Sequence, residues 1–144
     1  MTVPAGYSGT PLPRKLGIRA GSTVLVAGAP AGFDLGDLPD GVTVHRRRSR
    51  SGYDLVLAFC SDRATLIEGF ATWKALLGPA GSLWLAWPKR ASGVATDLTD
   101  GVVREVGLSG GLVDVKVAAV DPVWSALKLV YRLSDRPNVS STQA

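Results

Sequence analysis

Three short apolar runs constrain the fold of this sequence more than any other feature: Thr23–Ala27, Asp54–Cys60 and Ser82–Trp87. Each has the length of a strand, and an unbroken apolar run is typical of a strand buried on both faces of a parallel sheet. Between the second and third runs, apolar residues recur at helical spacing, namely Leu66, Phe70, Trp73 and Leu77. Strand, helix and strand in this order predict parallel strands whose connecting helices cover the sheet.

The ends of that helix also carry signals. Ser61 is a good N-cap residue, and Asp62 in the first turn suits the helix dipole. Gly78-Pro79 is expected to stop the helix after about residue 77. Upstream, Val42–His45 is a short strand candidate, whereas residues 28–41 hold too many Gly, Pro and Asp residues for a long helix.

The second half of the chain predicts one more helix and a hairpin. A helix is expected near residues 97–107, with Val102, Val103 and Val106 on its apolar face. Residues 113–121 alternate between apolar and polar, which indicates a strand near a sheet edge, and residues 124–133 return antiparallel to it. The predicted fold is therefore α/β and Rossmann-like: a mostly parallel sheet with helices on both faces and a C-terminal antiparallel hairpin.

The length of 144 residues suits one domain. We expect it to span residues 11–133, starting with a short helix or turn at Pro11–Ile18, between a flexible N-terminus (1–10) and a disordered tail (134–144). The sequence shows neither a secretion signal nor an apolar run long enough to cross a membrane, so a cytoplasmic location is expected. A lone cysteine, Cys60, excludes an internal disulfide and a zinc site built on several cysteines.

Two resemblances follow from this order of segments. The turn Leu76-Leu-Gly-Pro-Ala-Gly-Ser-Leu-Trp-Leu85, which leads from a helix into a buried strand, resembles the class I S-adenosylmethionine-dependent methyltransferases, in a shortened form. The whole domain also resembles a family of small bacterial proteins catalogued as a domain of unknown function. That likeness is carried by Gly6–Leu12, Lys15–Ile18, Ala29–Pro30, Trp87–Gly93, Asp97–Leu98, Gly111–Val117, Asp121 and Trp124–Ser125. The second resemblance implies no activity, cofactor or catalytic residue.

The cofactor signals of Rossmann-like proteins are weak here. Such sites use a Gly-rich turn after the first strand and an acidic residue at the end of the second. Here the turn is Gly28-Ala-Pro-Ala-Gly32, with Pro30 in its middle, and the second strand ends in His45-Arg46. We therefore predict no bound cofactor, and S-adenosylmethionine stays the alternative.

In open parallel sheets, ligands bind outside the carboxyl ends of the strands. This rule predicts a single rim that carries the candidate ligand-binding residues. They are Gly28, Ala29, Pro30, Gly32, Cys60, Arg63, Lys89, Arg90, Ser92 and Asp97. Basic side chains beside the start of a helix favour a small anion, although Lys89 and Arg90 as solvated charges, with Thr96 or Asp97 as a plain helix cap, explain the same residues.

Other chemistry is less well supported. Cys60 and His45 end neighbouring predicted strands, and if they met, His45 could activate Cys60 as a thiolate nucleophile. A single cysteine that closes an apolar strand is more often a buried apolar side chain. No second histidine or paired carboxylate supports a metal site, and none is predicted.

The basic run with Arg46, Arg47, Arg48 and Arg50 contributes to a net charge of +4 and suits either a nucleic-acid contact or a solvated loop. The sequence thus favours a non-catalytic module that binds a partner protein or a small anionic ligand. The alternatives are a divergent S-adenosylmethionine-dependent methyltransferase and nucleic-acid binding through residues 45–50.

Overall fold

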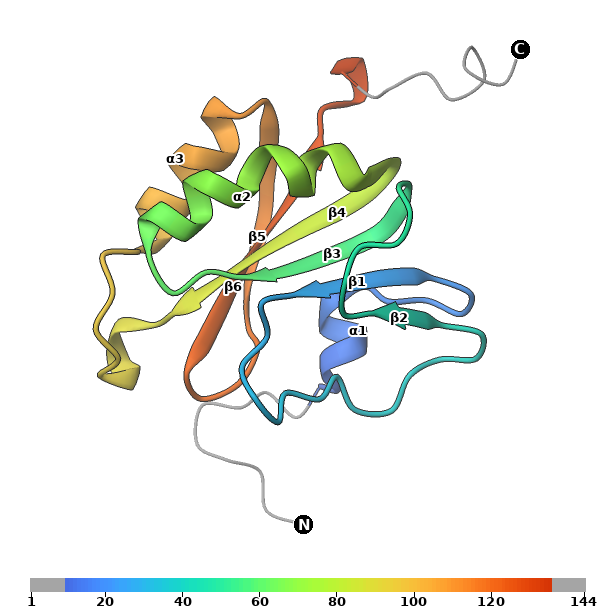
Figure 1. Cartoon of the computed structure of the whole chain (residues 1–144), viewed down its shortest axis with the longest axis horizontal. Coiled ribbons are helices and arrows are strands. Elements are labelled where there is room, and N and C mark those ends of the chain that lie inside the picture. The colour runs from blue at the N-terminus through green and yellow to red at the C-terminus, as the bar shows by residue number, and fades with distance from the viewer. Residues whose placement is uncertain (1–9, 136–144) are drawn as a thin grey trace.

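The computed structural model of the chain describes residues 10–135 and contains one six-stranded sheet (Figure 1). The strands are β1 Thr23–Ala27, β2 Thr43–His45, β3 Tyr53–Phe59, β4 Leu77–Pro88, β5 Leu112–Ala119 and β6 Trp124–Tyr131. The helices are α1 Leu12–Leu16, α2 Arg63–Leu76 and α3 Asp100–Ser109, with 3₁₀ turns η1 Arg90–Ser92 and η2 Leu133–Asp135. The expected flexible N-terminus and disordered tail lie outside the described residues, apart from Thr10, Ser134 and Asp135.

The sheet has the order β2-β1-β3-β4-β6-β5. Strands β2, β1, β3 and β4 run parallel, whereas β6 pairs antiparallel with both β4 and β5. The three apolar runs form β1, β3 and the second half of β4, and their central residues are buried. These strand directions confirm the predicted mostly parallel, Rossmann-like sheet with a C-terminal antiparallel hairpin.

Each face of the sheet has its own apolar core. Helices α2 and α3 lie together over one face, where Leu66, Phe70 and Val103 pack against the strands (Figure 1). The opposite face is covered by α1, through Leu12 and Leu16, and by the connection between β1 and β2. This connection, residues 28–42, contains no helix. No helix among residues 10–135 is long and apolar enough to cross a membrane.

Several predicted element boundaries are wrong, because neighbouring polar residues compete for the helix ends. Asp62, not Ser61, is the N-cap of α2, and its carboxylate accepts the N–H of Thr65 at 2.8 Å. The helix then ends at Leu76 and passes directly into β4, so Gly78-Pro79 lies inside the strand and not in a turn. The pairing of β3 with β4 shifts register at this point.

The last helix begins later than predicted. Helix α3 spans Asp100–Ser109, and the side chain of Thr99 caps it by accepting the N–H of Val102 at 3.2 Å. Residues 97–99 therefore belong to the preceding loop. Strand β5 lies at the edge of the sheet, as its alternating pattern predicted, and a register shift between Asp114 and Lys116 interrupts its pairing with β6. Such irregularities discourage further strands from pairing with an exposed edge.

Candidate functional site

The parallel strands end at one rim of the sheet. The N–H of Cys60, just after β3, donates to the carbonyl of Ala86 in β4 at 2.8 Å. On the other side of β3, a Cβ added to Gly28 would lie 3.1 Å from the carbonyl oxygen of Phe59, so the end of β1 is also close to β3. Lys89 follows β4 at the same edge. The rim predicted from the sequence therefore exists.

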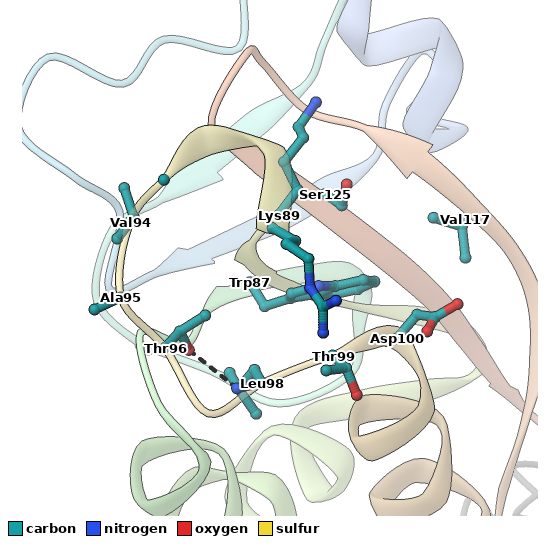
Figure 2. A pocket seen from close by; sticks show the side chains of 12 residues that line it. Trp87, Lys89, Val94, Ala95, Thr96, Leu98, Thr99, Asp100, Val117 and Ser125 are labelled. Atoms are coloured by element: carbon teal, nitrogen blue, oxygen red, sulfur yellow. Dashed lines mark hydrogen bonds between the residues drawn. The ribbon is translucent and has the colours of Figure 1, made fainter.

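The rim holds a pocket of about 560 Å³ at the end of β4 (Figure 2). It is lined by Trp87, Lys89, Arg90, Gly93, Val94, Ala95, Thr96, Leu98, Thr99, Asp100, Val117 and Ser125. These residues come from the end of β4, the loop after it, the start of α3 and the β5–β6 hairpin. Figure 2 shows Trp87 at the centre, with Thr99 and Asp100 on one side and Ser125 on another.

The loop between β4 and α3 is held by its own side chains. The Ser92 hydroxyl donates to the carbonyl of Lys89 at 2.6 Å and accepts the N–H of Val94 at 3.2 Å. The Thr96 hydroxyl donates to the carbonyl of Ser61 at 2.7 Å, which ties the loop to the start of α2. These bonds fix the backbone on which Lys89 stands at the pocket.

The charges of the pocket favour an anion. Lys89 and Arg90 supply two cations, and Asp100 supplies one carboxylate that lies 3.8 Å from Arg104. The first turn of α3 also faces this pocket through Thr99 and Asp100. Thr99 satisfies the N–H of Val102, while the first N–H groups of any helix lack intrahelical partners and carry the positive end of its dipole.

The start of α2 differs in this respect, although it lies at the same rim. Two carboxylates already occupy its first-turn amides: Asp62 accepts the N–H of Thr65 at 2.8 Å, and Asp97 accepts the N–H of Arg63 at 2.7 Å. The N–H and hydroxyl of Thr65 both favour the ionised carboxylate of Asp62, and they hold its pKa below the ordinary value. An incoming anion would meet two negative charges there.

Of the ten predicted ligand-binding residues, Lys89 and Arg90 line the pocket and the other eight do not. Asp97 and Ser92 instead form the structural hydrogen bonds just described. Arg63 lines a separate hollow between α2 and α3. The Gly28–Gly32 turn lies beyond β3; Gly28 and Gly32 take φ values of +69° and +80°, and Gly32 borders a second pocket beside α1.

Cys60 and His45 do not form a pair. The Cys60 side chain is 1% exposed, and burial, with a smaller contribution from the Asp62 charge, raises the pKa of its thiol from 9.0 to about 12. His45 Nδ1 lies 2.7 Å from the Tyr53 hydroxyl and 2.9 Å from the Ser49 hydroxyl. A neutral thiol without a neighbouring imidazole is no nucleophile at neutral pH.

The predicted nucleic-acid contact lies at the opposite edge of the sheet, on the connection between β2 and β3. All four arginines are exposed there. Arg46 donates to the carbonyl of Phe33 at 3.4 Å and covers its ring, and Arg50 donates to the carbonyl of Ser51. Nothing in this arrangement tests nucleic-acid binding, which stays a prediction. No group of three or more His, Cys, Asp or Glu side chains among residues 10–135 is arranged to hold a metal ion.

Most of the pocket lining was not among the predicted residues, including Thr99, Asp100, Val117 and Ser125. A capping threonine followed by an acidic first-turn residue is a recognisable helix start and makes the first two candidates, although Thr96 and Asp97 offer competing caps. The other two depend on the hairpin register, which pairs Ser125 with Trp87 across β6 and β4. No local sequence signal specifies that pairing.

Comparison with solved structures finds a similar fold in several methyltransferases. No family model and no curated protein matches the chain. The structure of DhpI in complex with S-adenosylhomocysteine is similar, with a TM-score of 0.59 and 12% identity over 85% of this chain and 83% of that one. A TehB-like S-adenosylmethionine-dependent methyltransferase from Corynebacterium glutamicum gives 0.57 and 14%, over 89% and 91%.

Magnesium protoporphyrin IX methyltransferase from Synechocystis, with S-adenosylhomocysteine bound, gives a TM-score of 0.54 and 13% identity over 78% of this chain and 75% of that one. At such low identity these likenesses show the fold alone. The methyltransferase-like architecture is therefore confirmed, whereas the resemblance to a family of small bacterial proteins stays a prediction.

The residues at the ends of β1 and β2 do not fit the cofactor pattern of this fold. The second strand should offer a carboxylate to the ribose, but His45 stands there, engaged by Tyr53 and Ser49. The connection after β1 provides no helix N-terminus for a ligand. Instead its Phe33 packs edge-on against Phe59, with ring centroids 4.9 Å apart.

Proposed function

We propose that this protein is a non-catalytic module on a methyltransferase-like fold, and that it binds a small anionic ligand at the carboxyl end of β4. One observation carries the proposal: the pocket there joins Lys89 and Arg90 to the first turn of α3. Cationic side chains and free helix amides together form the ordinary environment of a bound phosphate or carboxylate. The start of α2 on the same rim supports this location, since carboxylates already accept two of its amides and an anion there would face Asp62 and Asp97.

The lining of the pocket supports binding without catalysis. It contains no histidine or cysteine, and its one carboxylate, Asp100, lies beside Arg104. A proton-transfer step needs a base within reach of the substrate, with a pKa near the working pH. Apart from Asp100, the lining holds no carboxylate, histidine or cysteine that could be such a base.

The proposal is tested by titrating ¹⁵N-labelled protein with sodium pyrophosphate at constant ionic strength. We expect the amide signals of Asp100 and Gly101 to shift, and the Lys89→Ala/Arg90→Ala variant to bind at least about tenfold more weakly, because charge-assisted hydrogen bonds contribute about 1.5–3 kcal/mol each. The matched control is Arg47→Ala/Arg48→Ala, which removes the same charge from the opposite edge. Equal weakening in both variants, or no shift at all, would contradict the proposal.

A further variant separates binding from stability. Thr99→Asp keeps an N-cap residue of equal or better quality, so α3 should be as stable as before. It also places a negative charge beside the proposed anion, so pyrophosphate binding should be lost. Unchanged binding in this variant would show that the ligand does not use the start of α3.

The comparisons favour a second candidate, a divergent S-adenosylmethionine-dependent methyltransferase, because several structural neighbours are described with S-adenosylhomocysteine bound. Calorimetry with S-adenosylmethionine and S-adenosylhomocysteine discriminates between the two. The first candidate predicts neither heat nor a shift in melting temperature. Micromolar binding that persists in Lys89→Ala/Arg90→Ala would support the second candidate and overturn the first.

A further inference from the structure

The indole of Trp87 carries a hydrogen-bond donor that the protein does not use. Trp87 is only 5% exposed and lies in the lining of the β4 pocket. None of the hydrogen bonds within residues 10–135 involves its Nε1, yet no buried side-chain nitrogen or oxygen in that part of the chain lacks a partner. The Nε1–H must therefore be exposed to solvent. Buried tryptophans usually donate this group, as Trp84 does to the carbonyl of Leu16 at 3.0 Å.

One part of the pocket around this donor is apolar. Leu98 and Val117 line the pocket beside Trp87, and Val94 lies on the loop that borders it (Figure 2). Val117 on the hairpin is 46% exposed and Val94 on the loop is 47% exposed, and Figure 2 shows them on opposite sides of Trp87. A volume of about 560 Å³ lies in the range of sites for organic ligands. An inorganic phosphate would leave most of this apolar surface in water.

We propose that the pocket selects an aromatic carboxylate: a flat ring system packs against Val117 beside Trp87, its carboxylate lies between the basic residues and the start of α3, and one carboxylate oxygen accepts the Trp87 Nε1–H. This inference deepens the proposed function and depends on it. The apolar walls bind the ring by excluding water, whereas the cations and the indole donor orient the charged end.

The test uses the four indole Nε1–H signals in the ¹H–¹⁵N spectrum of the intact protein. The probes are 2-naphthoate, its uncharged analogue 2-naphthamide, and inorganic phosphate. We expect 2-naphthoate to shift the Trp87 indole signal and the Asp100 and Gly101 amides together. The naphthamide should bind at least tenfold more weakly, and phosphate should shift the amides without moving the indole signal.

Two variants complete the test. Trp87→Phe keeps an aromatic ring but removes the donor, and should weaken 2-naphthoate binding about three- to tenfold, the effect of one hydrogen bond. Trp73→Phe, on α2 outside the pocket lining, is the matched control and should bind normally. If Trp87→Phe does not fold, the indole shift in the unaltered protein still decides the matter.

The outcomes separate the two proposals. If phosphate and pyrophosphate shift the amides of α3 but 2-naphthoate leaves the Trp87 indole signal in place, the aromatic carboxylate is wrong and the anion site stands. If naphthoate and naphthamide bind equally, charge plays no part and the aromatic carboxylate is again excluded. If no probe shifts any of these signals, both proposals fail.

Discussion

Trp84 and Trp87 lie in the same strand, and replacing each by phenylalanine should have very different effects on stability. Trp84 is fully buried, and its Nε1 donates to the carbonyl of Leu16 at the end of α1. The Trp84→Phe change leaves that carbonyl unpaired, at about 1–3 kcal/mol. It also opens a cavity, on the order of 1–2 kcal/mol, because removing a whole aromatic side chain costs about 3–5.

Trp87→Phe removes the same atoms but breaks no hydrogen bond within the protein. The space it leaves opens into the pocket, so water fills it, and the expected loss is on the order of 1 kcal/mol or less. Urea unfolding followed by far-UV circular dichroism measures both values without relying on tryptophan fluorescence. A loss in Trp87→Phe equal to that in Trp84→Phe would mean that the Trp87 indole has a partner after all, and would refute this reasoning.

Three smaller predictions concern stability. Gly81→Ala places a Cβ 2.7 Å from the backbone oxygen of Tyr53 and should lower the free energy of unfolding by about 1–3 kcal/mol, whereas Gly101→Ala, in an open helix position, should raise it by about 0.5–1. Because folding raises the Cys60 pKa from 9.0 to about 12, its stabilising contribution is complete below pH 9 and is lost as the pH rises to 12. Burial also raises the pKa of Tyr131, so urea titrations at pH 8 and 11 should show a larger loss in the unaltered protein than in Cys60→Ala. Asp97→Ala should cost about 1 kcal/mol by freeing an amide of α2, measured by urea unfolding; no change would mean water replaces the carboxylate.

The strands could be predicted from the sequence because burial on both faces leaves a local record. Residues 23–27 and 54–60 are apolar without alternation, and both form central strands in the structure. The helix starts could not be placed in the same way. Thr96, Asp97 and Thr99 are all competent caps, and only tertiary contacts decide among them: Thr96 and Asp97 bond to the start of α2, which leaves Thr99 for α3.

Only two residues of the pocket lining could be predicted from the sequence, for a related reason. Lys89 and Arg90 follow a buried strand, so the rule that ligands bind at the carboxyl ends of parallel strands found them. The same rule gathered Gly28 and Cys60, because it says which residues share a rim but not which of them face one hollow. That depends on the loop conformations and on the antiparallel register of β6, through which Ser125 meets Trp87.

The helix amides available at the rim explain why the proposed site differs in place from the ligand site of other Rossmann-like proteins. Rossmann-like proteins hold their ligand on the helix that follows the first strand, and here the connection after β1 forms no helix and packs Phe33 over the end of β3. At the next helix start along the rim, that of α2, Asp62 and Asp97 already accept the amides. The start of α3 then offers amide N–H groups, and it lines the same pocket as Lys89 and Arg90. With no helix after β1, the anion site that we propose lies at the end of β4, on the other side of β3 from the place where Rossmann-like proteins ordinarily hold their ligand.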